Sequence, residues 1–135
     1  DNAEGLHYHL PIYNEMFNSK LPDYYAKKIN QYCIKNNLDN ILVVGLTYKD
    51  GSYLLEESQS YSISLKLSKK YKVFYYDPDA INDDIDYDLE EFNFNSYILG
   101  GIFLLNCSRD SKKIEMVKKI IQEKNLNYFQ LDIWE

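Results

Sequence analysis

The fold is indicated most clearly by two stretches, ILVVGLTYKDG at residues 41–51 and VFYYDP at residues 73–78. The aliphatic and β-branched run that opens the first stretch is typical of a strand buried on both faces. Gly45 then marks a sharp turn, and a helical pattern with Ser58 near its start leads to the second stretch. A strand, a helix and a second strand in this order predict a parallel βαβ unit.

The rest of the chain continues this alternation. Apolar periodicity predicts further strands at about 102–107 and 127–132. Pro22 opens a helical pattern that places Tyr25, Ile29, Tyr32 and Cys33 on one face. The longer helices are expected at 22–36, 57–69 and 111–124, and the strands at 40–46, 71–76, 102–107 and 127–132. We therefore predict an α/β fold, a three-layer Rossmann-like domain with a mostly parallel sheet and helices on both faces. Its expected bounds are 21–135, and residues 1–20 are interpreted as a linker or tail from a preceding region.

Composition narrows the class of protein. The 135 residues carry a net charge of −6, which argues against nonspecific binding of nucleic acid. No apolar run is long enough to span a bilayer, and no signal peptide is visible, so we expect a cytoplasmic protein without a membrane partner.

Cys33 and Cys107 are too scattered for a disulfide framework, and we expect reduced thiols. His7 and His9 lack further ligands at metal-binding spacing, and the acidic segment 77–91 does not fit a calcium loop, so no metal site is predicted. We interpret the acidic segment as a solvated loop with a short helix.

Lys49 is the best candidate for contact with a ligand, because it lies just past the carboxyl end of a predicted parallel strand. Ligands of open α/β sheets bind at that edge. The segment from Gly45 to Tyr48-Lys49, then Ser58, then Tyr76-Asp77-Pro78, resembles the C-terminal UDP-sugar-binding domain of the UDP-glucose/GDP-mannose dehydrogenase family. The family pattern is G-(L/F)-(A/T/S)-(F/Y)-K, a loop ending in D-x-R-x-S-P, a helix, and a strand closing on Y-D-P. The similarity extends from about residue 11 to the last strand.

This resemblance implies a function. Enzymes of the family use NAD to oxidise the primary alcohol of a UDP- or GDP-sugar to a uronic acid, which commonly feeds polysaccharide biosynthesis. In that setting Tyr48 and Lys49 would contact the nucleotide-sugar, and Gly45 and Ser58 would support the turn and the helix start. The implied partner is a UDP-sugar or a similar nucleotide-sugar. A homodimer formed through the central region of the parent enzyme is the implied assembly.

The chain also departs from the family pattern. Glu56 stands where the family has arginine, and Ser58-Gln59 replaces Ser-Pro. The sequence has no G-x-G-x-x-G fingerprint and no cysteine in a glycine-rich nucleophile loop. We therefore expect no catalytic residue and no cofactor bound by this domain alone, with NAD held elsewhere in the parent enzyme. Two alternatives stay open: a degenerate domain that serves assembly or binding without nucleotide contact, and an unrelated Rossmann-like domain.

Overall fold

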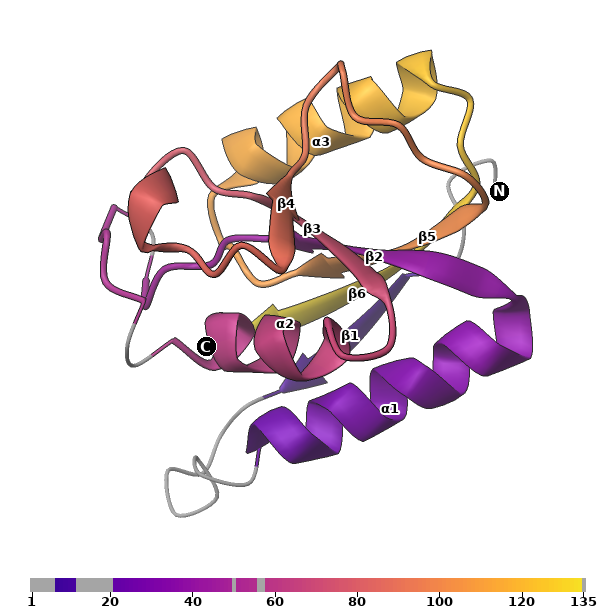
Figure 1. Cartoon of the computed structure of the whole chain (residues 1–135), viewed down its shortest axis with the longest axis horizontal. Helices are drawn as coiled ribbons and strands as arrows, with labels where there is room; N and C mark the ends of the chain where they lie inside the picture. The colour runs from indigo at the N-terminus through magenta and orange to yellow at the C-terminus, as the bar shows by residue number, and fades with distance from the viewer. Residues whose placement is uncertain (1–6, 12–20, 50, 56–57, 135) are drawn as a thin grey trace.

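A parallel sheet forms the middle layer of the molecule (Figure 1). The computed structural model describes residues 7–11, 21–49, 51–55 and 58–134. Within these residues, six strands lie in the order β1-β6-β5-β2-β3-β4, and every neighbouring pair is parallel. The elements along the chain are β1 (His7–Pro11), α1 (Leu21–Asn36), β2 (Leu38–Val44), α2 (Gln59–Leu67), β3 (Lys72–Tyr76), the short 3-10 helix η2 (Asn82–Asp84), β4 (Leu89–Glu91), β5 (Gly101–Asn106), α3 (Ser111–Glu123) and β6 (Tyr128–Trp134).

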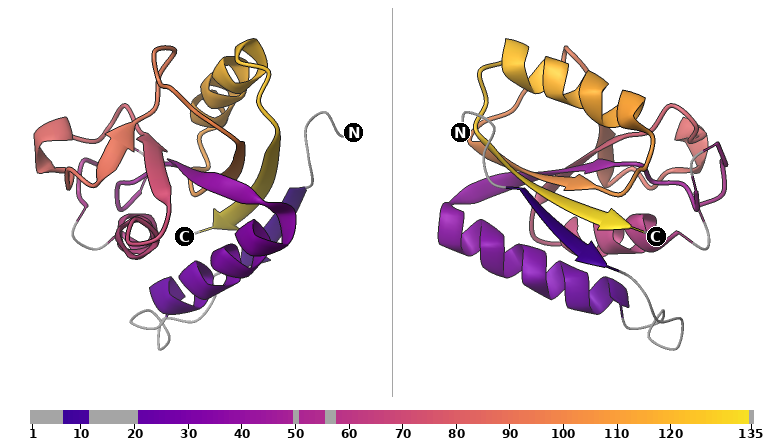
Figure 2. Two further views of the ribbon diagram at one scale, coloured as in Figure 1. Left: turned by 45° about the vertical axis from the view of Figure 1, so that its right-hand side comes forward. Right: turned by 180° about the vertical axis from the view of Figure 1, so that it is seen from behind.

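Helices cover both faces of this sheet, with α1 and α2 on one side and α3 on the other (Figure 2). Successive residues of a strand point to opposite faces, and the central strand β2 is buried along both. Ile41 and Val43 belong to the core under α1 and α2, whereas Leu42 and Val44 belong to the core under α3. The predicted three-layer α/β fold is thereby confirmed.

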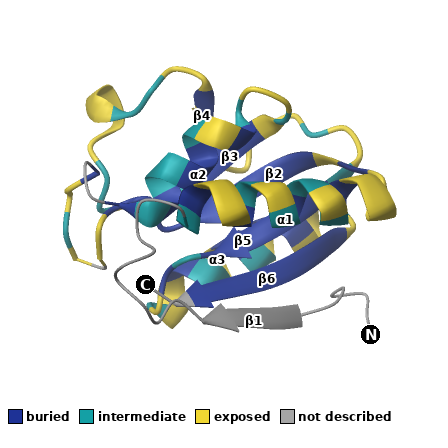
Figure 3. Cartoon of the chain, turned by 90° about the horizontal axis from the view of Figure 1, so that it is seen from below, coloured by how far each residue is buried: buried dark blue, intermediate teal, exposed yellow. Residues whose placement is uncertain are grey.

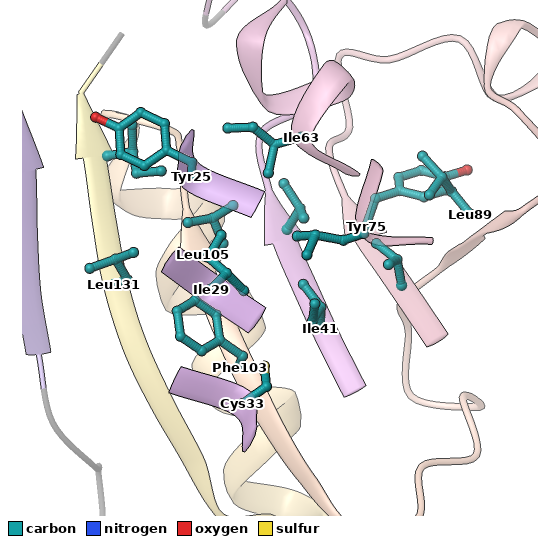
Figure 4. Close-up of a cluster of buried hydrophobic side chains, with 14 of the residues drawn as sticks. Tyr25, Ile29, Cys33, Ile41, Ile63, Tyr75, Leu89, Phe103, Leu105 and Leu131 are labelled. Carbon is teal, nitrogen blue, oxygen red and sulfur yellow. The ribbon is translucent and has the colours of Figure 1, made fainter. Parts of the chain in front are cut away.

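The larger core lies between α1, α2 and the sheet. Tyr25, Ile29 and Cys33 form the buried face of α1, as the helical spacing predicted, and Figure 4 shows them directed toward Phe103 and Leu105 of β5. Burying one side chain of this size stabilises the fold by about 1.5–3 kcal/mol. The outward faces of the helices are exposed, while β2, β3, β5 and β6 are mostly buried (Figure 3). No helix in the described part of the chain is both long and apolar enough to cross a membrane.

Two strands lie outside the sequence-based assignment. β4 falls within the acidic segment that was expected to be a loop with a short helix, and it pairs with β3. β1 falls within residues 1–20, and its backbone pairs with β6 from His7 opposite Gln130 to Pro11 opposite Trp134. Without β1, the remaining five strands have the order 3-2-1-4-5 of a Rossmann-like half. The boundary between a tail and a domain near residue 20 stays a prediction.

The topology brings three loops to one edge of the sheet. Because all strands are parallel, the loops that follow β2, β3 and β5 leave the sheet at its carboxyl edge. From β2 the chain proceeds first to β3 on one side and later reaches β5 on the other, so the strand order reverses at β2. In open α/β sheets, this switch point is where ligands bind.

Candidate functional site

The three loops meet closely at Gly45, the first residue after β2. Its N–H donates to the carbonyl of Tyr76 at 3.0 Å, and its φ is +89°, a conformation that favours glycine. A Cβ at this position would lie 3.1 Å from Cβ of Ser108 in the loop after β5. Gly45 thus allows the loop after β2 to pass against the loop after β5.

Asp77, which ends the Tyr-Asp-Pro motif, fixes the turn after β2. One carboxylate oxygen, Oδ2, accepts hydrogen bonds from the N–H groups of Leu46 and Thr47 at 2.8 and 3.0 Å, and from the Thr47 hydroxyl at 3.1 Å. The other oxygen, Oδ1, accepts from the N–H of Asp79 at 3.0 Å. The Asp77 side chain is 0% exposed. Its buried carboxylate therefore satisfies the first backbone N–H groups of the turn.

Lys113 supplies the positive charge that a buried carboxylate requires. Its Nζ lies 3.0 Å from Oδ1 of Asp77 and 2.8 Å from Oδ2 of Asp79. The Lys113 side chain is 3% exposed, and that of Asp79 is 36% exposed. Buried ions are tolerated in proteins when they are paired and hydrogen-bonded, and both conditions hold here. We call Asp77, Asp79 and Lys113 the charged clamp.

The candidate ligand residues, Tyr48 and Lys49, lie on the outer side of this turn. Tyr48 is 42% exposed, and Lys49 is also exposed. Asp79 holds the following part of the turn, because its Oδ2 accepts the N–H of Gly51 at 3.0 Å. The N–H of Ser52 donates to the Lys49 carbonyl at 3.0 Å, and Gly51 has a φ of +84°. Tyr48 and Lys49 are therefore presented to solvent at the carboxyl edge by a hydrogen-bonded turn.

Ser58 is the N-cap of α2. Its hydroxyl oxygen accepts from the N–H of Tyr61 at 3.2 Å and lies 2.8 Å from the hydroxyl of Ser60. Its own N–H donates to the Leu55 carbonyl at 3.0 Å. Ser58 is buried and fixes the start of the helix that follows the turn.

Residues at the end of β5 and in the loop before α3 serve local structure. Asn106 is buried, and its Oδ1 accepts the N–H of Ser108 at 3.2 Å, while Arg109 is exposed. Asp110 is the N-cap of α3. Glu56, which replaces the family arginine, lies outside the described residues. Among those that are described, no three His, Cys, Asp or Glu side chains are grouped to hold a metal ion.

Neither cysteine is in a disulfide; Cys33 is buried, and Cys107 is partly buried. Burial raises the pKa of the Cys33 thiol to about 12. A thiol held so firmly in its protonated form is a packing residue of the core, because the thiolate is the reactive species.

The charged clamp was not predicted from the sequence. Lys113 precedes Val117 and Ile120 by four and seven residues, so it lies on the apolar stripe of α3. A lysine at such a position must find a partner when the stripe packs on the sheet. The acidic residues after β3 were the available partners, and this combination was the signal in the sequence.

An all-parallel sheet, covered by helices on both faces and reversing its order at β2, defines a Rossmann-like α/β domain. Among solved structures, this fold matches that of the UDP-N-acetyl-mannosamine dehydrogenase Cap5O from S. aureus, with a TM-score of 0.56 and 18% sequence identity. That enzyme belongs to the UDP-glucose/GDP-mannose dehydrogenase family, which the sequence motifs resemble. The match covers 85% of this chain but 32% of the length of the enzyme. At this identity, the match establishes a shared fold. No protein-family model matches the chain, and no curated protein matches it.

Proposed function

We propose that this chain is the nucleotide-sugar-binding part of a nucleotide-sugar 6-dehydrogenase, and that Tyr48 and Lys49 contact the nucleotide-sugar. The observation that carries the proposal is the Tyr48-Lys49 pair, exposed at the carboxyl edge of a sheet whose fold matches part of such an enzyme. In the whole enzyme, NAD would take the hydride when the primary alcohol of the sugar is oxidised. This chain would bind and orient the substrate.

The contacts of the turn suggest how an anionic ligand would be recognised. The N–H groups of Leu46, Thr47 and Gly51 already donate to the clamp carboxylates, so they are engaged within the protein. The ammonium of Lys49 would then provide the charge that meets a diphosphate, as a flexible point charge. The Tyr48 ring, exposed beside it, offers an apolar face and a hydroxyl for the sugar or the base.

The test is a calorimetric titration of the full chain with UDP, repeated with Lys49→Ala. Loss of a charge-assisted hydrogen bond costs about 1.5–3 kcal/mol, so the variant should bind about 10- to 150-fold more weakly. Lys35→Ala is the matched control, because it removes the same charge near the end of α1, at the amino edge of the sheet. Equal affinity of Lys49→Ala and the unsubstituted chain would overturn the assignment of Lys49.

A second candidate function is assembly without nucleotide contact. It is favoured by the internal carboxylates that engage the amides of the turn, and by Glu56, whose charge is opposite to that of the family arginine. Under this alternative, UDP would not bind, and the chain would self-associate or associate with the remainder of its parent enzyme. Sedimentation velocity with and without UDP separates the two candidates.

A further inference from the structure

We propose that Lys113 is a positioning residue, which orders the turn carrying Tyr48 and Lys49 by holding the carboxylates of Asp77 and Asp79. The inference rests on the proposed function for the consequence of that order, namely binding of a nucleotide diphosphate. The ordering itself is a property of the chain that can be measured without a ligand.

The Lys113 ammonium contacts the loop that follows β3. Lys113 belongs to the first turn of α3, on the opposite side of the sheet from α2, and its side chain is buried. Both carboxylates that it contacts come from the loop after β3, and the N–H of Asp79 donates to Asp77 at 3.0 Å. One cation from α3 therefore holds two neighbouring anions of a different loop.

The carboxylates of Asp77 and Asp79 also accept hydrogen bonds from the turn after β2. Asp77 accepts the N–H groups of Leu46 and Thr47, which immediately precede Tyr48. Asp79 accepts the N–H of Gly51, which lies two residues beyond Lys49. The Tyr48-Lys49 pair is thus flanked on both sides by backbone N–H groups that donate hydrogen bonds to the charged clamp.

The positive charge of Lys113 offsets the repulsion between the carboxylates of Asp77 and Asp79. Without the ammonium, two adjacent carboxylates would repel each other, and the more exposed one would gain most from turning toward water. That carboxylate is Asp79, since Asp77 is fully buried and keeps its contacts with Leu46 and Thr47. Loss of the Lys113 charge should therefore release the Gly51 side of the turn first, leaving Lys49 without a fixed direction.

The experiment replaces Lys113 with methionine, which retains an unbranched side chain without the charge. Lys112→Met is the matched control, because Lys112 is the exposed neighbour on the same helix. Backbone ¹⁵N relaxation should show the order parameters of Lys49 and Gly51 falling from about 0.85 to below about 0.6 in Lys113→Met. Those of core residues such as Leu104, and all values in Lys112→Met, should stay unchanged.

A second variant keeps the test decisive if Lys113→Met fails to fold. Asp79→Ala removes the acceptor of the Gly51 N–H but leaves the pair of Asp77 and Lys113 in place, and it should mobilise Gly51 while the core stays ordered. Unchanged order parameters at Lys49 and Gly51 in the folded variants would overturn the proposal, whatever UDP does.

The consequence for binding is tested by a double-variant cycle with UDP as the probe. Lys113→Met should weaken UDP binding about tenfold in the unsubstituted chain and should have no further effect when Lys49 is already alanine. Equal weakening in both backgrounds would contradict an action through Lys49. If the unsubstituted chain fails to bind UDP, the proposed function is overturned, and the relaxation data still decide whether Lys113 orders the turn.

Discussion

Replacing Asp77 with asparagine should be among the most damaging single-atom changes available in this fold. Oδ2 of Asp77 accepts three hydrogen bonds from Leu46 and Thr47. Oδ1 accepts the N–H of Asp79 and forms the ion pair with Lys113. An amide has one oxygen and one NH₂ group. In one orientation, the NH₂ group faces the Asp79 N–H and the Lys113 ammonium; in the other, it faces the three donors of the turn. Either orientation places donor against donor in a buried site.

The magnitude follows from the orientation that loses least. That orientation keeps the three donors of the turn and forfeits one backbone hydrogen bond and the buried ion pair. Breaking a buried pair by removing one partner costs about 3–5 kcal/mol. We therefore expect the free energy of unfolding to fall by about 4 kcal/mol. With an unfolding entropy of about 2.1 cal/mol/K per residue over 135 residues, Tm should fall by about 14 °C.

Thermal and urea unfolding, followed by circular dichroism, measure this loss. Asp83→Asn is the control, because it removes the same charge from an exposed residue of η2 and should shift Tm by less than about 2 °C. A decrease of less than about 1 kcal/mol for Asp77→Asn would refute the reasoning, since the clamp would then contribute no more than a surface ion pair.

Three further outcomes are expected. Gly45→Ala should lower the free energy of unfolding in urea by about 1–2 kcal/mol more than Gly51→Ala does. Both glycines have positive φ, but a Cβ would meet a neighbouring loop only at Gly45. Equal losses would contradict a close approach of the two loops at Gly45. Ser58→Ala should cost about 1 kcal/mol through loss of the α2 cap, and a neutral result would contradict the capping role. The pKa of Cys33 is raised by burial from 9.0 to about 12, so the unfolded state ionises first, and stability should fall by about 1 kcal/mol between pH 8 and 10; Cys33→Ala should show a shallower decline, and an identical decline would exclude Cys33 as its source.

The framework of the fold could be predicted because its elements follow simple patterns. The run from Ile41 to Val44 is buried on both faces, and the spacing of Tyr25, Ile29 and Cys33 matches the buried face of α1. Those patterns depend on local burial, which a sequence records directly. The alternation of strands and helices then fixed a parallel sheet through the rules of crossover connections.

The two unpredicted strands lack such patterns. β4 is three residues long, and two of them are exposed glutamates, so its backbone pairing with β3 leaves almost no trace in the side chains. β1 carries two histidines and ends in a proline, and its assignment depends on pairing with β6, which lies more than a hundred residues later. Edge strands are specified by a partner, and the partner is not visible in the local sequence.

Only the contiguous part of the candidate site could be proposed from the sequence. The motif that contains Tyr48 and Lys49 is contiguous, and its position after a strand placed it at the carboxyl edge. The charged clamp joins residues 77 and 79 to residue 113, from two loops that meet only in the folded chain. A buried lysine in an apolar helical stripe was its one local sign.

An NMR titration of the ¹⁵N-labelled chain with UDP tests most directly whether Tyr48 and Lys49 contact a nucleotide diphosphate. We expect saturable shift changes at Tyr48, Lys49 and Gly51, with none at Asn37 and Leu38 on the amino edge of the sheet. Absence of saturable changes at Tyr48 and Lys49 at millimolar UDP, or changes confined to another surface, would contradict this contact.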